Sequence, residues 1–578
     1  MIRYGRFRAG LLCFALAAAG CGGGGTAAVR PPQSPSGAKT ASVTLTIVIP
    51  QGTSSKQRRP AFLSPAVKSV SVTITGPAPG GSTSGPFVGN CSSGGFCSQT
   101  VDAPIGQDTF SVSLYDGLNA TGKLLSSGSA TVTISAAQTN TVTITFNPVV
   151  GAATATLASS VLVGTASSIP VALVAADPDG ATIASPGNFE TASGAPTTLS
   201  ITLHDTTGHF SLQGPTSYTA PQTPGALTLN YDGSLLHFAY PTLTVSQDGT
   251  PIGTVQIVVL PSPVAPSVTI TSAADFATSL AEGADGNVWF TARTLGNPPG
   301  SDAQVGKYAV SSATVTNYPL PNADSDPELA TLAPDGAVWF YEQNRTRFAK
   351  ITTGGSLSEF NASFTVTAMA QGPDGNLWFI ANTTPVSVGK ITPSGTITTY
   401  ALPNGATPAA LTAAAGRIWM IGAYDSFNLT AKLESIATDG TGYTSTTITL
   451  TNAPFQQGPV KMYTGRDGNF YISIASTYAL TVFRITPAAV GTGLCSGSDH
   501  DGAAPSAQLD DGSIVFGAMS TLLPSSLLGV SVGGSCTTVR YPYMDPIQST
   551  TLLSGAGDGY LYLYSTKSSG GMLTKYAY

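Results

Sequence analysis

One histidine stands between two carboxylates in the C-terminal half of the chain, in the run Asp499-His500-Asp501-Gly502. An imidazole can act as a general base near neutral pH, and carboxylates can hold a divalent cation that stabilises developing negative charge. The same residue types also favour a solvated turn, because Asp and Gly tolerate turn geometry. His500 is therefore either a base beside a metal site or part of a plain loop.

A second charged group lies near the middle of the chain, where Glu342 is followed by Arg345 and Arg347. Arg293 follows an equivalent aromatic run earlier in the sequence. Arg293, Glu342 and Arg345 are candidate binding residues, and the alternative is that they are solvated loop charges. Glu342 and His500 are the candidates for catalysis. A base within reach of the proton and an electrophile are both required, so these two residues alone establish neither a catalytic set nor a metal site.

The N-terminus has the pattern of an export signal, with a basic region and then an apolar run over residues 11–19. That run is shorter than the roughly 20 residues that cross a bilayer. Ala18-Ala19-Gly20-Cys21 resembles the bacterial lipobox, which implies a signal peptide over residues 1–20 and lipidation of Cys21. The alternative is an ordinary signal peptide with an incidental cysteine. We expect an exported, lipid-anchored protein of the cell envelope, at the outer membrane or cell surface.

The remaining cysteines predict two disulfides. Of six cysteines, Cys13 is lost with the signal and Cys21 is lipidated, which leaves four in an oxidising compartment. Cys91 and Cys97 flank a short Gly-containing turn and should pair, so Cys495 and Cys536 pair by elimination. Zinc ligation is not indicated, because no histidine lies at ligand spacing from these cysteines.

Length and composition indicate an extracellular all-β protein of several domains. The chain has 578 residues, too many for one core, and only 9% are charged. The formal net charge of -6 and the lack of an extended Lys/Arg cluster exclude nucleic acid as a partner. The lipid on Cys21 would be the only contact with a membrane.

The N-terminal half predicts a tether and two sandwiches. Residues 21–40 are rich in Gly, Pro and Ser and should form a flexible tether. Alternating β-branched runs, such as 43–49 and 141–146, predict an immunoglobulin-like β-sandwich over residues 41–149, and a second over 150–262. Prolines at 261, 263 and 266 then predict a stiff linker. Three histidines of the second sandwich are interpreted as ordinary strand or edge residues: His204, His209 and His237.

Beyond residue 275 one motif recurs seven times, a Gly-containing turn followed by an aromatic-bearing strand. The glycines of these turns are 39 to 52 residues apart, and all four tryptophans of the chain occupy the same motif position. This period is typical of four-stranded propeller blades. Residues 267–578 are therefore predicted to form a seven-bladed β-propeller. The turns begin at Asp285, Asp335, Asp374, Ala415, Asp467, Asp511 and Asp558.

The two ends of the propeller predict how it closes. The final run, residues 571–576, fits the third strand of the last blade, so the outer strand of that blade is missing. Residues 268–271 precede the first inner strand and could fill the gap, which would remove exposed sheet edges. The bond between Cys495 and Cys536 would then staple blades five and six.

Residues 373–403 resemble the repeat of the virginiamycin B (streptogramin B) lyase family, through Pro-Asp-Gly-Asn-Leu-Trp-Phe and Val-Gly-Lys-Ile-Thr-Pro-Ser-Gly. The resemblance covers about residues 267–578. It implies a seven-bladed propeller and a magnesium-dependent elimination that opens a cyclic depsipeptide. The family's chemical residues do not carry over, because among the positions after the Trp-bearing strands only Glu342 keeps a carboxylate, and His500 does not match the family's histidine.

Two main functions are left open. The first is a surface lipoprotein whose propeller is a binding or scaffold module for a glycan, peptide or envelope partner, without a cofactor. The alternative is a streptogramin B lyase-like C–O lyase or a hydrolase with a diverged active site, and the lyase would require magnesium. A third option is carbohydrate attachment through the sandwiches.

Overall fold

The computed structural model describes residues 39–48, 63–76, 82–92, 96–136, 138–184, 187–222, 225–264, 266–272, 275–294, 302–422, 424–451, 461–475, 479–498, 505–518, 526–540, 551–567 and 570–578. These residues form an all-β protein, as predicted, with a single 3-10 turn at Gln343–Arg345. The chain divides into two compact units, one built mainly from Val67–Gly122 and Ser127–Thr145 and the other from Phe146–Tyr578. No helix in the described ranges is long and apolar enough to cross a membrane.

The first unit contains two antiparallel sheets. Its core follows the period of two that the sequence shows, because Val70, Val72 and Ile74 are buried on one strand and Val112 and Leu114 on its neighbour. A disulfide joins Cys91 to Cys97. The immunoglobulin-like topology stays a prediction. The sheets are formed by β1 (Thr40–Val48) with β4 (Phe96–Pro104), and by β3 (Thr83–Asn90), β2 (Ser69–Thr75), β5 (Gly106–Tyr115) and β6 (Leu124–Ile134) in this order.

The strand expected over residues 141–146 is wrong, because these residues enter no ladder and the next strand, β7, begins at Asn147 (Asn147–Pro148). The segment instead passes very close to Gly128 in β6. A Cβ atom added to Gly128 would lie 2.6 Å from Ile144 Cγ2 and 2.6 Å from the Thr145 carbonyl oxygen. The alternation of β-branched residues over 141–146 therefore accompanies close packing of this segment against β6, and not the pairing of a strand.

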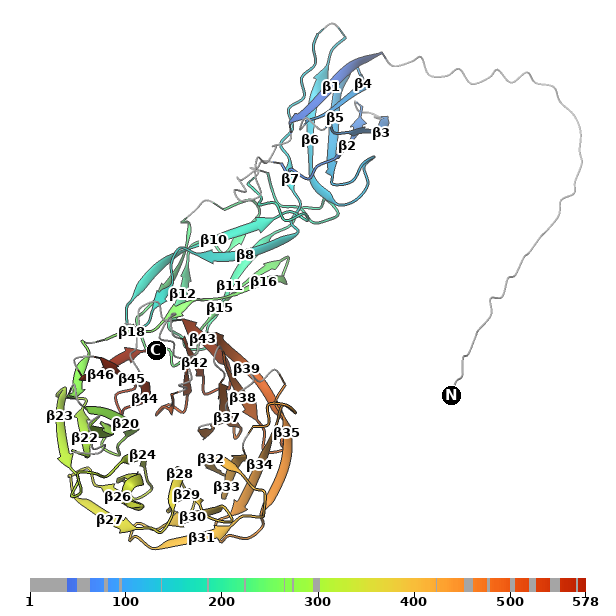
Figure 1. The fold of residues 1–578 in the computed structure, drawn as a ribbon. Coiled ribbons are helices and arrows are strands. Elements are labelled where there is room, and N and C mark those ends of the chain that lie inside the picture. The colour runs from blue at the N-terminus through green and yellow to red at the C-terminus, as the bar shows by residue number, and fades with distance from the viewer. Residues whose placement is uncertain are drawn as a thin grey trace, which may run out of the picture. The chain divides into compact units, whose positions relative to one another are not determined.

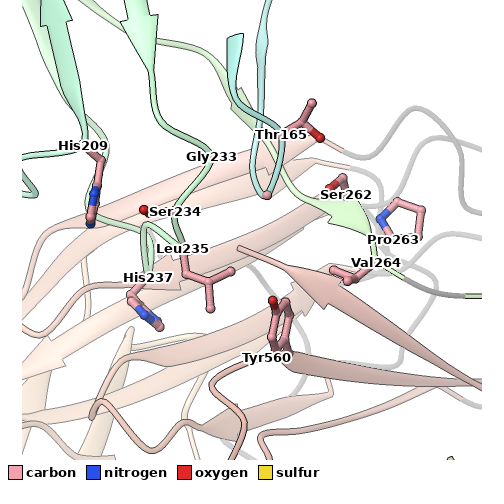
Figure 2. A pocket seen from close by; sticks show the side chains of 11 residues that line it. Thr165, His209, Gly233, Ser234, Leu235, His237, Ser262, Pro263, Val264 and Tyr560 are labelled. Atoms are coloured by element: carbon pink, nitrogen blue, oxygen red, sulfur yellow. The ribbon is translucent and has the colours of Figure 1, made fainter.

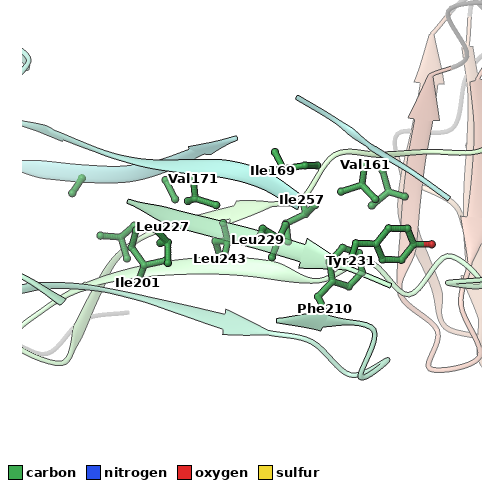
Figure 3. Packing of buried hydrophobic residues seen from close by; sticks show 14 of the residues in the cluster. Val161, Ile169, Val171, Ile201, Phe210, Leu227, Leu229, Tyr231, Leu243 and Ile257 are labelled. Atoms are coloured by element: carbon green, nitrogen blue, oxygen red, sulfur yellow. The ribbon is translucent and has the colours of Figure 1, made fainter. Parts of the chain in front are cut away.

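The second unit begins with a pair of four-stranded antiparallel sheets whose inner faces share one core. Figure 3 shows this core, in which Val171, Leu227 and Leu243 are fully buried and Phe210 stacks on Tyr231 with ring centroids 4.8 Å apart. The strands of the first sheet are, in order, β12 (Phe210–Gln213), β14 (Leu227–Tyr231), β10 (Ser167–Ala176) and β8 (Ala152–Leu157). Those of the second are β13 (Ser217–Tyr218), β11 (Leu199–His204), β15 (Thr242–Gln247) and β16 (Thr250–Gln256). A short parallel pair is formed by β9 (Val161–Leu162) and β17 (Val259–Leu260).

The propeller has seven blades arranged in a ring (Figure 1), as the repeat predicted. From the inner strand outward, blades one to three are β20 (Asp275–Glu282), β21 (Val288–Thr294), β22 (Gln304–Ala309), β23 (Thr314–Pro319); β24 (Pro327–Leu332), β25 (Val338–Glu342), β26 (Arg347–Ile351), β27 (Leu357–Asn361); and β28 (Thr365–Gln371), β29 (Leu377–Asn382), β30 (Ser387–Ile391), β31 (Ile397–Ala401).

Blades four to seven continue the ring. They are β32 (Pro408–Ala414), β33 (Arg417–Gly422), β34 (Thr430–Ala437), β35 (Thr444–Thr449); β36 (Met462–Thr464), β37 (Phe470–Ala475), β38 (Ala479–Ile485), β39 (Gly491–Ser498); β40 (Ser506–Gln508), β41 (Ile514–Ala518), β42 (Ser526–Val530), β43 (Cys536–Arg540); and β44 (Thr551–Ser554), β45 (Leu561–Lys567), β46 (Gly570–Ala577). A disulfide between Cys495 and Cys536 joins blades five and six.

The predicted closure of the ring is confirmed. β19 (Val268–Thr271) pairs antiparallel with β46 and supplies the missing outer strand of blade seven. β18 (Ser262–Pro263) also pairs with β46. The segment expected to be a stiff linker is therefore hydrogen-bonded to the last blade. Pro263 is tolerated there because a residue at a sheet edge can do without an N–H donor.

The repeated motif forms a contact between neighbouring blades, which we call the Lys staple. In blade three, Asp374 accepts a hydrogen bond from Trp378 Nε1 at 2.9 Å, and Lys390 Nζ lies 3.0 Å from Asp374. Lys390 also donates to the Thr438 carbonyl of blade four at 2.7 Å. Burial opposes ionisation of Asp374, but hydrogen bonds from Trp378, Asn376 and Lys390 outweigh it and lower the pKa of that carboxyl. Equivalent staples use Lys307 in blade one and Lys350 in blade two.

The tryptophan of each staple also fills the space between blades. Trp289 belongs to the core of blade two, Trp339 to that of blade three, and Trp378 to that of blade four. All three are at most 1% exposed. Each of these three tryptophans thus buries apolar surface that a single blade cannot cover alone.

Candidate functional site

The loops that follow the Trp-bearing strands lie at one end of the propeller. Antiparallel pairing brings the end of each such strand beside the start of the inner strand, for example Glu342 opposite Pro327 and Asn382 opposite Thr365. We call this end of the propeller the rim. It carries Arg293, Glu342 and Arg345, the three residues singled out from the sequence.

Arg293 connects blades one and two at the rim. Its Nη1 atom lies 2.7 Å from Asp326 Oδ1, and its guanidinium group lies 5.1 Å from the centre of the Phe276 ring. Nearby, burial and then the charge of Asp326 raise the pKa of Glu328, and Arg293 partly opposes this rise. Glu328 is a carboxyl group at the start of an inner strand that the sequence motif did not single out.

Glu342 is fully buried and forms a structural ion pair. Its Oε2 atom accepts hydrogen bonds from Ser325 Oγ at 2.5 Å and from Arg347 Nη2 at 2.7 Å. Arg347 Nη2 also lies 2.9 Å from Glu359, whose pKa is raised by burial and by the nearby charge of Glu342. With 0% of its side chain exposed, Glu342 offers no surface to a ligand, and its contacts hold the strand β26 in place.

Arg345 is the exposed member of the predicted group. It ends the short 3-10 turn, after which Thr346 adopts a left-handed conformation with φ of 46°. Arg345 Nε donates to Asp324 Oδ1 at 2.9 Å, and this hydrogen bond lowers the pKa of Asp324. The side chains are 39% and 57% exposed, so the pair is accessible at the rim.

The blade-four loop of the rim presents an aromatic ring to solvent. Phe427 lies between β33 and β34 and is 93% exposed. Hydrogen bonds hold the turn at Phe427, because Asp425 Oδ1 accepts from the backbone N–H groups of Phe427 at 3.0 Å and Asn428 at 3.2 Å. Asp425 Oδ2 accepts from Asn428 Nδ2 at 2.7 Å. These bonds, first the one from the Asn428 side chain, lower the pKa of Asp425, which therefore holds the turn as an anion.

Three of the described rim carboxylates form ion pairs that disfavour a magnesium site. Asp324, Asp326 and Glu342 are each paired with an arginine, which neutralises the charge that would attract a divalent cation. Nowhere in the described ranges are three or more His, Cys, Asp or Glu side chains grouped to hold a metal. His500 and its two aspartates, like Cys21, lie outside the described residues.

Comparison with known proteins places the propeller near one family. Residues 250–441, which include the first three blades and most of the fourth, match the model of the Virginiamycin B lyase family. The chain thus contains a virginiamycin B lyase-like propeller. No curated protein matches the chain.

Solved structures also match. A streptogramin B lyase is 17% identical, with 54% of this chain and 96% of the other covered, at a TM-score of 0.40. A catalytically inactive virginiamycin B lyase from Staphylococcus aureus with quinupristin is 18% identical, with 54% and 98% covered, at 0.41. A luciferin-regenerating enzyme is 12% identical, with 55% and 96% covered, at 0.33.

Proposed function

We propose that this protein is a lipid-anchored binding module of the cell envelope whose propeller rim docks a protein or peptide partner. The observation that carries the proposal is Phe427, an almost completely exposed ring on a turn fixed by Asp425. Because hydrogen bonds already hold the turn, little conformational entropy of the turn should be lost when a partner covers the ring. A Phe side chain gains about 1.5–3 kcal/mol when it is fully buried.

Other groups of the rim support the same function. Protein interfaces commonly combine an aromatic anchor with arginine and a polar border. The exposed pair of Arg345 and Asp324 supplies charged groups on the same end of the propeller. The arginine-paired carboxylates favour binding over elimination chemistry, because an ion-paired or fully buried carboxylate is a poor base. The lipid anchor rests on the Cys21 motif and the tether that follows it.

The test is site-specific photo-crosslinking in the intact envelope, with a photoreactive amino acid at position 427 of the full-length protein. We expect one discrete adduct, suppressed by added wild-type protein but not by the Phe427→Ser variant. The identified partner should then bind Phe427→Ser at least tenfold more weakly. The control position is Val490, which is 56% exposed on the turn between β38 and β39, at the opposite end of its blade.

Two results would overturn the proposal. Equal adducts from positions 427 and 490, or none from 427, would show that the rim does not dock a partner. Ring opening of a cyclic depsipeptide by the purified protein with magnesium would show that the propeller is an enzyme, as the alternative function requires.

A further inference from the structure

A hollow of about 610 Å³ lies where the second sandwich meets the propeller, away from the rim. Figure 2 shows that its walls come from sandwich loops, the β18 segment and blade seven. We call it the junction pocket. Its volume falls within the usual range for small-ligand sites, about 300–1,000 Å³. It is lined by Gly164, Thr165, His209, Gly233, Ser234, Leu235, His237, Ser262, Pro263, Val264 and Tyr560.

The walls of the junction pocket are joined by direct contacts. The backbone N–H groups of Leu236 and His237 donate to the Tyr578 carbonyl at 2.9 and 3.0 Å. Phe238 is buried against Tyr578, with ring centroids 4.9 Å apart. His237 and Phe238 adopt left-handed conformations with φ of 49° and 60°, an uncommon geometry for these residues that the contacts with Tyr578 hold in place. These contacts hold the loop that carries His237 against the end of blade seven.

Two histidines at the pocket lie beside aspartates. His209 Nδ1 is hydrogen-bonded to Asp232 Oδ2 at 2.9 Å, which orients this imidazole and leaves its other nitrogen for a further hydrogen bond. His237 Nδ1 lies 3.1 Å from Asp511 Oδ2 without hydrogen-bond geometry. Both rings are about one-third exposed at 33% and 35%, so each can offer a hydrogen-bonding atom to a ligand.

The rest of the lining mixes hydroxyl groups with aliphatic surface. Thr165, Ser234 and Tyr560 contribute hydroxyls, and Figure 2 shows the Tyr560 hydroxyl end directed into the hollow. Leu235 and Val264 contribute apolar surface, and Val264 is 46% exposed. Such a lining matches a ligand that carries hydroxyl groups beside C–H faces.

The charges around the junction pocket select among polar ligands. Its lining contains no lysine or arginine. The nearby Lys575 is paired with Asp558 at 2.7 Å, and each histidine lies beside a carboxylate. An anionic ligand would find no lysine or arginine in the lining and would lie near the carboxylates beside the two histidines. A fully apolar ligand would leave the hydroxyls and imidazoles unpaired. We infer that the junction pocket binds a neutral carbohydrate, with its hydroxyls on His209 and His237 and its C–H surface on Leu235 and Val264.

The inference can be tested by calorimetry on the detergent-solubilised mature protein. The probes are neutral gluco-, galacto-, manno- and N-acetylglucosamine oligosaccharides, with a uronic acid oligomer and inorganic phosphate as anionic counterparts. We expect saturable binding of a neutral sugar, and a higher Tm at saturation because a ligand stabilises the docked junction. Thr165→Phe should fill the hollow and weaken binding at least tenfold.

Two further variants separate recognition from folding. His237→Gln keeps a hydrogen-bonding side chain and should retain part of the affinity for the sugar, whereas His237→Ala should bind the sugar at least tenfold more weakly. Both variants and Thr165→Phe should keep the circular dichroism spectrum of the wild type. Phe427→Ser, at the rim, should bind the sugar normally. The inference is overturned if no neutral sugar binds, if the anionic probes bind more tightly, or if Thr165→Phe binds as well as wild type.

Discussion

Replacing Lys390 with methionine would remove the charged end of one Lys staple and keep most of its aliphatic stem. The ammonium lies 3.0 Å from Asp374, 2.7 Å from the Thr438 carbonyl of the next blade and 5.4 Å from the centre of the Trp378 ring. A hydrogen bond to a charged group contributes about 1.5–3 kcal/mol, and a cation–π contact at an exposed site about 0.5–1 kcal/mol.

Two features reduce the stability that the Lys390→Met substitution should remove. The Lys390 side chain is 21% exposed, so water competes for the charge, and Asp374 keeps its bonds from Trp378 and Asn376. The methionine retains packing by its stem. We therefore expect the free energy of unfolding of the propeller to fall by about 2 kcal/mol.

The assay is urea unfolding of the full chain followed by tryptophan fluorescence, since Trp378 itself belongs to the staple. The control is Lys432→Met, on an exposed position of blade four, which should change stability by less than about 0.5 kcal/mol. A double-mutant cycle with Asp374→Asn should give a coupling energy of about 1 kcal/mol. If Lys390→Met is no more destabilising than Lys432→Met, the staple does not hold the blades together. A coupling of zero would show that the ion pair of Lys390 with Asp374 adds nothing to stability.

Two other predictions concern charge and anchoring. Burial, followed by a hydrogen bond with Asp510, raises the pKa of Glu282 from 4.5 to about 8. The folded state therefore binds this proton more tightly than the unfolded state, so stability should fall as pH rises from 4.5 to 8. After solvent screening the loss should be about 1–2 kcal/mol, and Glu282→Gln should abolish it; equal Tm profiles for both proteins would contradict this reasoning. Mass spectrometry should find a lipid on Cys21 of the mature protein, and Cys21→Ala should move the protein to the soluble fraction, whereas an unmodified mature N-terminus would rule out the anchor.

The architecture of the propeller could be predicted because its signals are local. The turn at Asp374 and Gly375 and the indole of Trp378 lie within five positions, and their contact repeats in neighbouring blades. The closing strand could also be predicted locally, because residues 268–271 alternate as the residues of a strand do. The last blade also lacked an outer strand in the sequence that follows it. Local patterning and global topology agree at these positions.

The sites could not be predicted in the same way, because their contacts span the fold. His237 meets Asp511 of blade six, and no spacing in the sequence marks that pair. Glu342 has the residue type of a catalytic group, but its burial follows from Arg347 and Ser325, which surround it only after the hairpin forms. In the sequence, nothing distinguishes Phe427 from an aromatic residue of the core. Its exposure follows from the turn that Asp425 holds through hydrogen bonds to the backbone.

The shared blade also sets the order in which the protein can be built. Ser267 beside β19 and Thr574 on β46 share a hydrogen bond, although they are 307 positions apart in the chain. Joining segments so distant costs about 5 kcal/mol of loop-closure entropy. Blades one to six consist of sequential hairpins and can form as the chain emerges, whereas blade seven must wait for its last residues. Ring closure is therefore a late folding step, and β19 lacks its partner strand until the last residues of the chain have been made.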